Sequence, residues 1–340
     1  MAGKSGREIS IESPKKVKDY ILSWEGILVI LFVVINIFCK FISPVYNITN
    51  VFREMPKYLA EIFLLFPMAY ILLMGEIDIS VGSTVCLCAT VGCLASNAGV
   101  PFIVVVLVTL LTGCVCGMIN GFLTIQFREL PTMIITLGTQ IVYRGIAEII
   151  LGDGGSVSLT DGPGKAGFKA IAGKAGIIPY VFFLVAICAI VFTVVALKRV
   201  YGRNLYAIGS NSKTAFYSGV KVKSMLFSAY TIIGVFAALS GLFLTSATYG
   251  ANTTTGKNFE MDAIAMAVFG GISTLGGKGN LIGAIISAFI IVCLRIGLGQ
   301  INMNPQVILI ILGILLISAV MLPNISQSIS DKKKKAAKAQ

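Results

Sequence analysis

Long apolar runs recur along almost the whole chain, separated by short segments that hold most of the charged residues. Apolar residues make up 56% of the 340 residues and charged residues only 12%, and the mean hydropathy is +0.90. A soluble domain has about 25% charged residues, and one soluble core cannot bury this much apolar surface. We therefore expect an all-α membrane protein.

A membrane-spanning helix needs about 20 apolar residues, and the apolar runs supply ten candidates. Two of these runs are short and rich in small residues, which is typical of helices that are broken or surrounded by protein. We expect one bundle of about ten transmembrane helices, at 26–42, 57–74, 81–97, 101–123, 131–151, 176–197, 224–249, 261–277, 281–299 and 305–322.

The positive charges indicate how this bundle is oriented. Cytoplasmic segments of membrane proteins carry an excess of Lys and Arg. With the N-terminus inside, ten spans return the C-terminus inside and place 18 of the 27 Lys and Arg in cytoplasmic segments, against 6 in outer loops. We expect a cytoplasmic segment at 1–25, a transmembrane domain at 26–322 and a basic cytoplasmic tail at 323–340. This clustering points to membrane lipid, and not to nucleic acid, as the partner of the basic residues.

Several kinds of function are excluded by what the sequence lacks. The chain has no histidine, which removes imidazole metal sites and Ser/His/Asp or Cys/His catalysis. The eight cysteines all lie in apolar runs, and their short spacings place neighbours on different helix faces, so we expect packing residues and no metal site. A phosphate-binding Walker A motif is absent. We expect neither a cofactor nor an ATPase site in this chain.

The first candidate functional segment is Gly75–Gly82, which separates two apolar runs and contains two acidic residues. It is either a hinge that orients a membrane helix, with Asp78 or Ser80 as its cap, or an ordinary cytoplasmic turn before a capped helix. A catalytic pair of Glu76 and Asp78 is a third alternative, although one residue separates them and no other catalytic group is evident.

The second candidate is the loop 198–223, the longest on the cytoplasmic side. Asn211 or Ser212 can cap the N-terminus of a helix of about two turns, and Gly219 can follow its C-terminus. A short helix flanked by basic residues on the inner face is suited to docking on a cytoplasmic partner. The alternative is an interfacial helix that lies on anionic headgroups.

Two further features lie inside the apolar runs. Arg144 and Glu148 are four residues apart and either form an intramembrane pair or line a solute path, because such charges usually face the bundle interior or water. Gly113, Gly117 and Gly121 form a stripe of small residues, which predicts close packing against another helix.

Several motifs occur together over roughly residues 55–320: Gly75–Gly82, Leu130–Gly138 with Arg144-Gly145, Gly202–Val220, Ala263–Gly271, Leu275–Gly279 and Gly283. In this order they resemble the permease subunits of bacterial ribose-type ABC sugar importers, a group that includes xylose, galactose, rhamnose and autoinducer-2 permeases. Thr214 departs from the family pattern where a small Ala is common, and Glu76 where Gly is common.

The resemblance implies an importer subunit with ten spans that pairs with a second permease subunit, as a homodimer or a heterodimer. It also implies two cytoplasmic ABC ATPase subunits, which hold ATP and Mg²⁺, and an extracytoplasmic solute-binding protein. The residues it implies for ATPase coupling, around a coupling helix, are Asn204, Gly209, Asn211, Thr214, Ala215, Ser218 and Gly219. Those it implies as structural motifs are Asp78, Ser80, Gly82, Gly270, Gly271, Gly276 and Gly277.

The expected function is therefore that of a multi-pass permease of the bacterial inner membrane, which translocates a sugar and is driven by separate ATPase subunits. The alternatives are an ABC importer of a nucleoside or of an autoinducer-2-like signal, and an ion-coupled secondary transporter or channel. An ion-coupled transporter would usually carry more intramembrane carboxylates.

Overall fold

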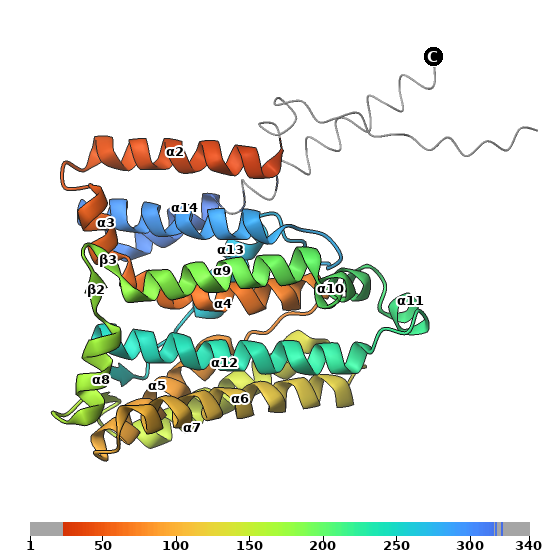
Figure 1. Cartoon of the computed structure of the whole chain (residues 1–340), viewed down its shortest axis with the longest axis horizontal. Coiled ribbons are helices and arrows are strands. Elements are labelled where there is room, and N and C mark those ends of the chain that lie inside the picture. Colours follow the sequence, from red (N-terminus) through yellow and green to blue (C-terminus); the bar gives the residue numbers. More distant parts are fainter. Residues whose placement is uncertain (1–22, 316, 318–320, 322–340) are drawn as a thin grey trace, which may run out of the picture.

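The computed structural model describes residues 23–315, 317 and 321, and these form one bundle whose long helices run side by side (Figure 1). The predicted basic tail at 323–340, and all but the last residues of the predicted segment 1–25, lie outside the described residues. In the described part of the chain, seven helices are long and apolar enough to cross a bilayer. They are α2 (Trp24–Ile42), α4 (Pro56–Leu73), α6 (Phe102–Gln126), α7 (Thr132–Leu151), α9 (Tyr180–Lys198), α12 (Val222–Thr248) and α14 (Leu281–Gln300).

Shorter elements complete the bundle. The shorter helices are α3 (Ile48–Glu54), α5 (Val81–Asn97), α8 (Pro163–Ile171), α10 (Val200–Ser210), α11 (Ser212–Tyr217), α13 (Phe259–Phe269) and a last helix at Pro305–Leu315. Two antiparallel pairs of short strands correct the all-α prediction: β1 (Ser156–Ser158) with β4 (Gly250–Asn252), and β2 (Lys174–Ala175) with β3 (Ile178–Pro179). They arise where loop backbone groups need partners that no helix supplies.

Each of the ten predicted runs contains a helix, but some boundaries differ. The helix predicted at 261–277 already ends at Phe269, because Gly270 and Gly271 close it and Gly271 adopts a φ of +94°. The helix predicted from 176 begins at Tyr180, directly after Pro179. The apolar pattern therefore located these helices, while glycine set the end of α13 and proline set the start of α9.

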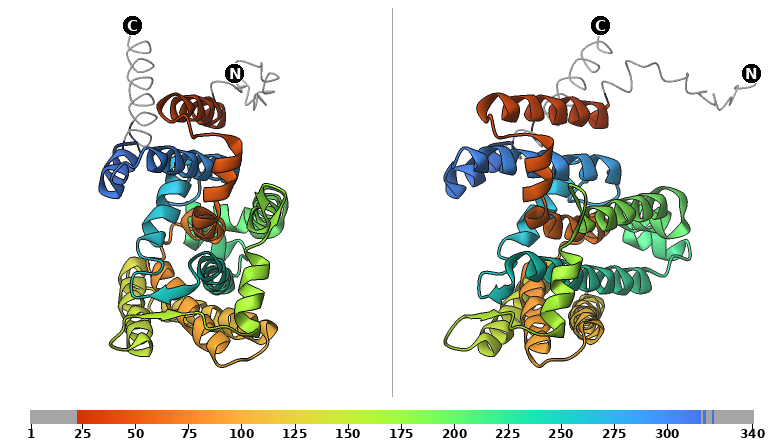
Figure 2. Two further views of the ribbon diagram at one scale, coloured as in Figure 1. Left: turned by 90° about the vertical axis from the view of Figure 1, so that its left-hand side faces the viewer. Right: turned by 60° about the vertical axis from the view of Figure 1, so that its left-hand side comes forward.

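Helix α4 lies at the centre of the bundle. Every residue from 59 to 73 is buried, and α9, α12, α13 and α14 pack around it. Helix α2 lies at the edge of the bundle (Figure 2), where it contacts α14. Large apolar side chains of α2, such as Phe41, are exposed. Exposed apolar surface on peripheral helices fits a lipid environment.

The glycine stripe of α6 packs directly on α12, as the sequence predicted. A Cβ at Gly113 or Gly117 would collide with the backbone around Gly234 and Tyr230. Small residues at such crossings let two backbones approach closely, so this contact is specified by sequence.

Candidate functional site

Helices α5 and α13 each begin directly after an irregular segment, and their first turns meet inside the bundle. Residues 74–80 lead from α4 to α5, and residues 253–258 lead from β4 to α13. The first turns of these helices touch: Gly82 packs on the backbone of Gly256, and the carboxylate of Glu260 lies against Gly82. Broken helices with facing N-termini place polar backbone groups inside a bundle, as membrane transport sites require.

Asp78 and Ser80 form a buried hydrogen-bond network before α5. Ser80 donates to Asp78 Oδ1 from its backbone N–H at 2.8 Å and from its hydroxyl at 2.7 Å. Asn120 of α6 donates to Ser80 Oγ at 2.7 Å, and Tyr143 of α7 donates to Asn120 Oδ1 at 3.1 Å. Asp78 is only 1% exposed, so this network lies inside the bundle. The Ser80 side chain makes no capping bond to α5.

Glu76 and Arg128 connect the same segment to α11. Arg128 lies 3.5 Å from Glu76 Oε1 and donates to the Ser212 hydroxyl at 3.1 Å. Burial raises the pKa of the Glu76 carboxyl, while hydrogen bonding from Thr132 and the charge of Arg128 oppose that shift. Ile77 also donates its N–H to the Thr132 hydroxyl, at 3.4 Å. The irregular segment is thus held to the first turn of α7.

Four predicted motif positions meet at the end of the bundle that carries α11. A Cβ at Gly209 would collide with the carbonyl of Leu73 and the N–H of Gly277, and a Cβ at Gly276 would lie 2.7 Å from the Gly75 nitrogen. The N–H of Gly277 donates to the Leu73 carbonyl at 2.9 Å. We call these five residues, Leu73, Gly75, Gly209, Gly276 and Gly277, the glycine junction. It joins the end of α10 to the segments that border α5 and α13.

Helix α11 has the caps predicted from sequence. The Asn211 side chain accepts from the Thr214 N–H at 2.9 Å. At the other end Gly219 has a φ of +88°, and Val220 donates to the Ala215 carbonyl at 3.1 Å, which is a Schellman motif. Ser218 donates its hydroxyl to the Thr214 carbonyl at 2.9 Å, while Ala215 is buried.

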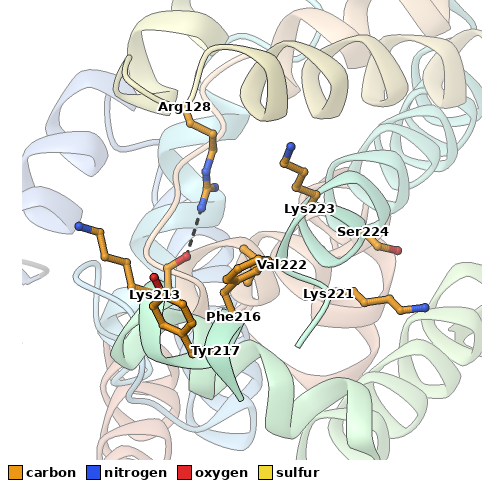
Figure 3. A pocket seen from close by; sticks show the side chains of 9 residues that line it. Arg128, Lys213, Phe216, Tyr217, Lys221, Val222, Lys223 and Ser224 are labelled. Atoms are coloured by element: carbon orange, nitrogen blue, oxygen red, sulfur yellow. Dashed lines mark hydrogen bonds between the residues drawn. The ribbon is translucent and has the colours of Figure 1, made fainter. Parts of the chain in front are cut away.

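The outward surface of α11 is aromatic and basic. Phe216 is 65% exposed and Tyr217 is 85% exposed. Beside them lies a groove of about 560 Å³ (Figure 3). Its lining includes four cationic side chains, those of Arg128, Lys213, Lys221 and Lys223. Such a surface fits a protein cleft with an apolar floor and an acidic rim.

The remaining motif residues lie close to this end. Asn204 is half-buried in α10. Gly270 packs its backbone against Gly283 and Ala284 of α14, and Gly271 lies against the indole ring of Trp24. The two glycines let these helix ends approach closely.

Arg144 has different partners from the predicted one. It donates to the backbone carbonyls of Thr253 and Thr255, at 3.0 and 2.8 Å, which lie just before α13. Glu148 is exposed, and the described residues hold no ion pair between it and Arg144. These backbone carbonyls accept from Arg144 in place of Glu148, because they lie in a Gly- and Thr-rich turn that leaves them without helical hydrogen-bond partners.

One charged cluster was not predicted as a unit. Arg295 of α14 donates to Glu61 of α4 at 2.8 Å and to Asp262 of α13 at 2.6 Å. The signal available from sequence was one isolated cation and two isolated acids inside apolar runs, which need partners in lipid. Sequence alone does not say which of them meet.

Comparisons with known proteins decide the family. Residues 58–320 match the family described as branched-chain amino acid transport system / permease component. The chain belongs to this family. The permease is also 33% identical to the D-allose transport system permease protein AlsC of Escherichia coli (strain K12), over 94% of this chain and 98% of that protein.

Relatives of a second kind match over slightly less of the permease. It is 30% identical to the autoinducer 2 import system permease protein LsrD of Enterobacter sp. (strain 638), over 88% of this chain and 92% of that protein. It is 33% identical to LsrD of Photorhabdus luminescens, over 76% and 78% respectively. No solved structure matches the permease. The predicted resemblance to sugar and autoinducer-2 permeases, and the multi-pass membrane location, are confirmed.

Proposed function

We propose that this permease is the membrane subunit of an ATP-driven importer in the bacterial inner membrane, and that it carries a sugar. The near full-length match to a D-allose permease supports a sugar as the solute. The observation that carries the proposal is the glycine junction, because it connects α10, which leads into the capped, protruding helix α11, to the segment before α5 and to the residues that follow α13.

The proposal includes ten spans and cytoplasmic termini. Within the described residues, α5, α13 and Pro305–Leu315 are too short to count as spans by length alone, but α5 and α13 are each preceded by an irregular segment that extends their path. The cations of the α11 groove gather at one end of the bundle, which supports a cytoplasmic position for that end.

The proposed partners are two ATPase subunits, a second permease subunit and an extracytoplasmic solute-binding protein. ATP and Mg²⁺ would bind the ATPase subunits, and α11 would be the coupling helix that seats in a cleft of the ATPase. The exposed Phe216 and Tyr217, surrounded by cations, support that docking.

The proposed mechanism is a change of access and involves no chemistry in this chain. Closure of the ATPase dimer would move α11, and the rigid backbone contacts at Gly209 would carry that movement to Leu73 and Gly277. The segment before α5 and the residues that follow α13 would then shift together, and the path would open to one side at a time. Selectivity can reside in the binding protein, because a ligand shifts such an equilibrium only through differential affinity.

Reconstitution tests the proposal. Proteoliposomes that contain the permease, the ATPase subunits and the binding protein should accumulate D-allose only when ATP is supplied, and the permease alone should accumulate none. Deletion of 214–218 should abolish uptake without loss of membrane insertion. Accumulation driven by an ion gradient without ATP would establish the secondary-transporter alternative instead. Uptake of autoinducer 2 or a nucleoside in place of any sugar would correct the solute.

A further inference from the structure

A file of polar side chains runs along α7 in an otherwise apolar helix. Gln140, Arg144 and Glu148 are each four residues apart, so they lie on one face. Neighbouring side chains on the same helix are apolar and exposed, among them Ile141 at 69%. Amide and charged groups cost several kcal/mol in hydrocarbon. This face of α7 therefore needs water or another polar surface next to it.

The file continues onto α13 through Glu260. Gln140 Nε2 donates to Glu260 Oε1 at 3.3 Å, and Glu260 is only 5% exposed. Its second carboxylate oxygen, Oε2, has no hydrogen-bond partner among the described residues. A buried carboxylate oxygen without a donor is costly, so Oε2 gains free energy from any donor that reaches it.

The same face connects to an open polar cleft. Arg144 donates to the carbonyl of Thr255, and Thr255 also lines a cleft of about 390 Å³ at the end of the bundle opposite α11. The polar residues Ser156, Ser158 and Asn252 line it as well. A continuous series of polar groups thus leads from the cleft to Glu260.

We propose that Gln140, Arg144, Glu148 and Glu260 line a water-filled path for a polyhydroxylated solute, with Glu260 Oε2 accepting from its hydroxyl groups. The assignment rests on the proposed function, whose second permease subunit would close the path on its open side. Carboxylate and amide oxygens accept from hydroxyls, and the Arg144 guanidinium donates to them. A neutral polyol therefore finds both kinds of partner without needing a counter-ion.

Thiol accessibility tests whether the file faces water. Residues 140 and 141 lie at the same depth of α7, so Ile141→Cys is a matched control for Gln140→Cys. Both variants are labelled in the full transporter, and labelling of the parent chain, which keeps its native cysteines, gives the background rate. A membrane-impermeant methanethiosulfonate reagent should modify the thiol at 140 at least tenfold faster than that at 141, and D-allose should slow the reaction. Equal rates of modification at 140 and 141 would overturn the proposal. So would a failure of the reagent to modify both Gln140→Cys and Glu148→Cys.

A transport measurement tests the role of Glu260. Glu260→Gln keeps the size of the side chain but weakens the acceptor, so the KM for D-allose should rise at least fivefold. An unchanged KM would remove Glu260 from the path. Thiol access requires no ATPase. If Gln140→Cys is accessible to water but ATP-driven uptake fails, the ATP-driven mechanism is overturned while the water-filled position of the α7 side chains is retained.

Discussion

Gly209 has no room for a side chain, because three backbone segments meet around it. Its neighbours are the Leu73 carbonyl and the Gly277 N–H, which are bonded to each other at 2.9 Å. Neither is the flexible end of a side chain, so neither can move aside cheaply. One missing methyl group therefore determines how closely α10 approaches the segments that border α5 and α13.

Gly209→Ala should destabilise the permease by at least about 2 kcal/mol, since overpacking against backbone forces whole segments apart. Gly138→Ala is the control, because nothing lies within 4 Å of a Cβ built there. That change should stabilise α7 by about 0.5–1 kcal/mol. Thermal unfolding in detergent, followed by size-exclusion chromatography, measures both. Equal melting temperatures for the two variants would contradict the close approach.

Arg295 holds two acids that come from different helices. Arg295→Met should cost about 3–5 kcal/mol, because Glu61 and Asp262 are left without their cation in a buried site. The triple variant Glu61→Gln, Asp262→Asn, Arg295→Met removes all three charges and should recover most of that loss. The same melting measurement compares them. A single variant as stable as the parent would show that the cluster is not a structural unit.

At the scale of elements, α11 is stabilised mainly by its own caps. It has 6 residues, and a helix this short is not stable by propensity alone. Its N-cap, Asn211, and its C-terminal Gly219 are both local to the helix. Docking would therefore involve a helix that is already formed.

Asn211→Ala should weaken α11 by about 1 kcal/mol and lower the rate of ATP-driven uptake, with little change in overall stability. Asn47→Ala provides a matched control, because Asn47 caps α3 with the same bond, from the Asn50 N–H at 2.9 Å. Uptake by that variant should stay near the parent rate. If both variants lose uptake equally, α11 has no special role in coupling.

At the scale of the whole molecule, the two ends of the bundle differ in chemistry. One end carries α10 and α11, and the other carries the short strands, α3 and α8 (Figure 1). The basic groove lies beside α11, at the first end. The glycine junction lies at the first end and the polar cleft at the second. This polarity fits a transporter that is driven from one side and loaded from the other.

Topology labelling checks that polarity. Lys213→Cys, on α11, should react with an impermeant thiol reagent only after the cells are permeabilised. Lys169→Cys, on α8, should react in intact cells once the outer membrane is made permeable. The opposite labelling pattern would reverse the orientation proposed for the bundle.

Residue order alone determined where the long apolar helices lie and which residues cap α11. Hydropathy over about 20 residues and capping bonds between residues three apart are local properties, so they can be read without the fold. The glycine stripe of α6 was also readable, since its spacing requires a close neighbour.

Only the tertiary structure decided which distant residues meet. Gly209 contacts Leu73 and Gly277, Arg295 joins Glu61 to Asp262, and Arg144 binds the turn before α13 in place of Glu148. Each of these contacts joins residues far apart in the chain, and many pairings of the same glycines and charges satisfy the local rules equally well. Packing of the whole bundle selects one of them, because only that arrangement buries the helices without leaving these charges unpaired.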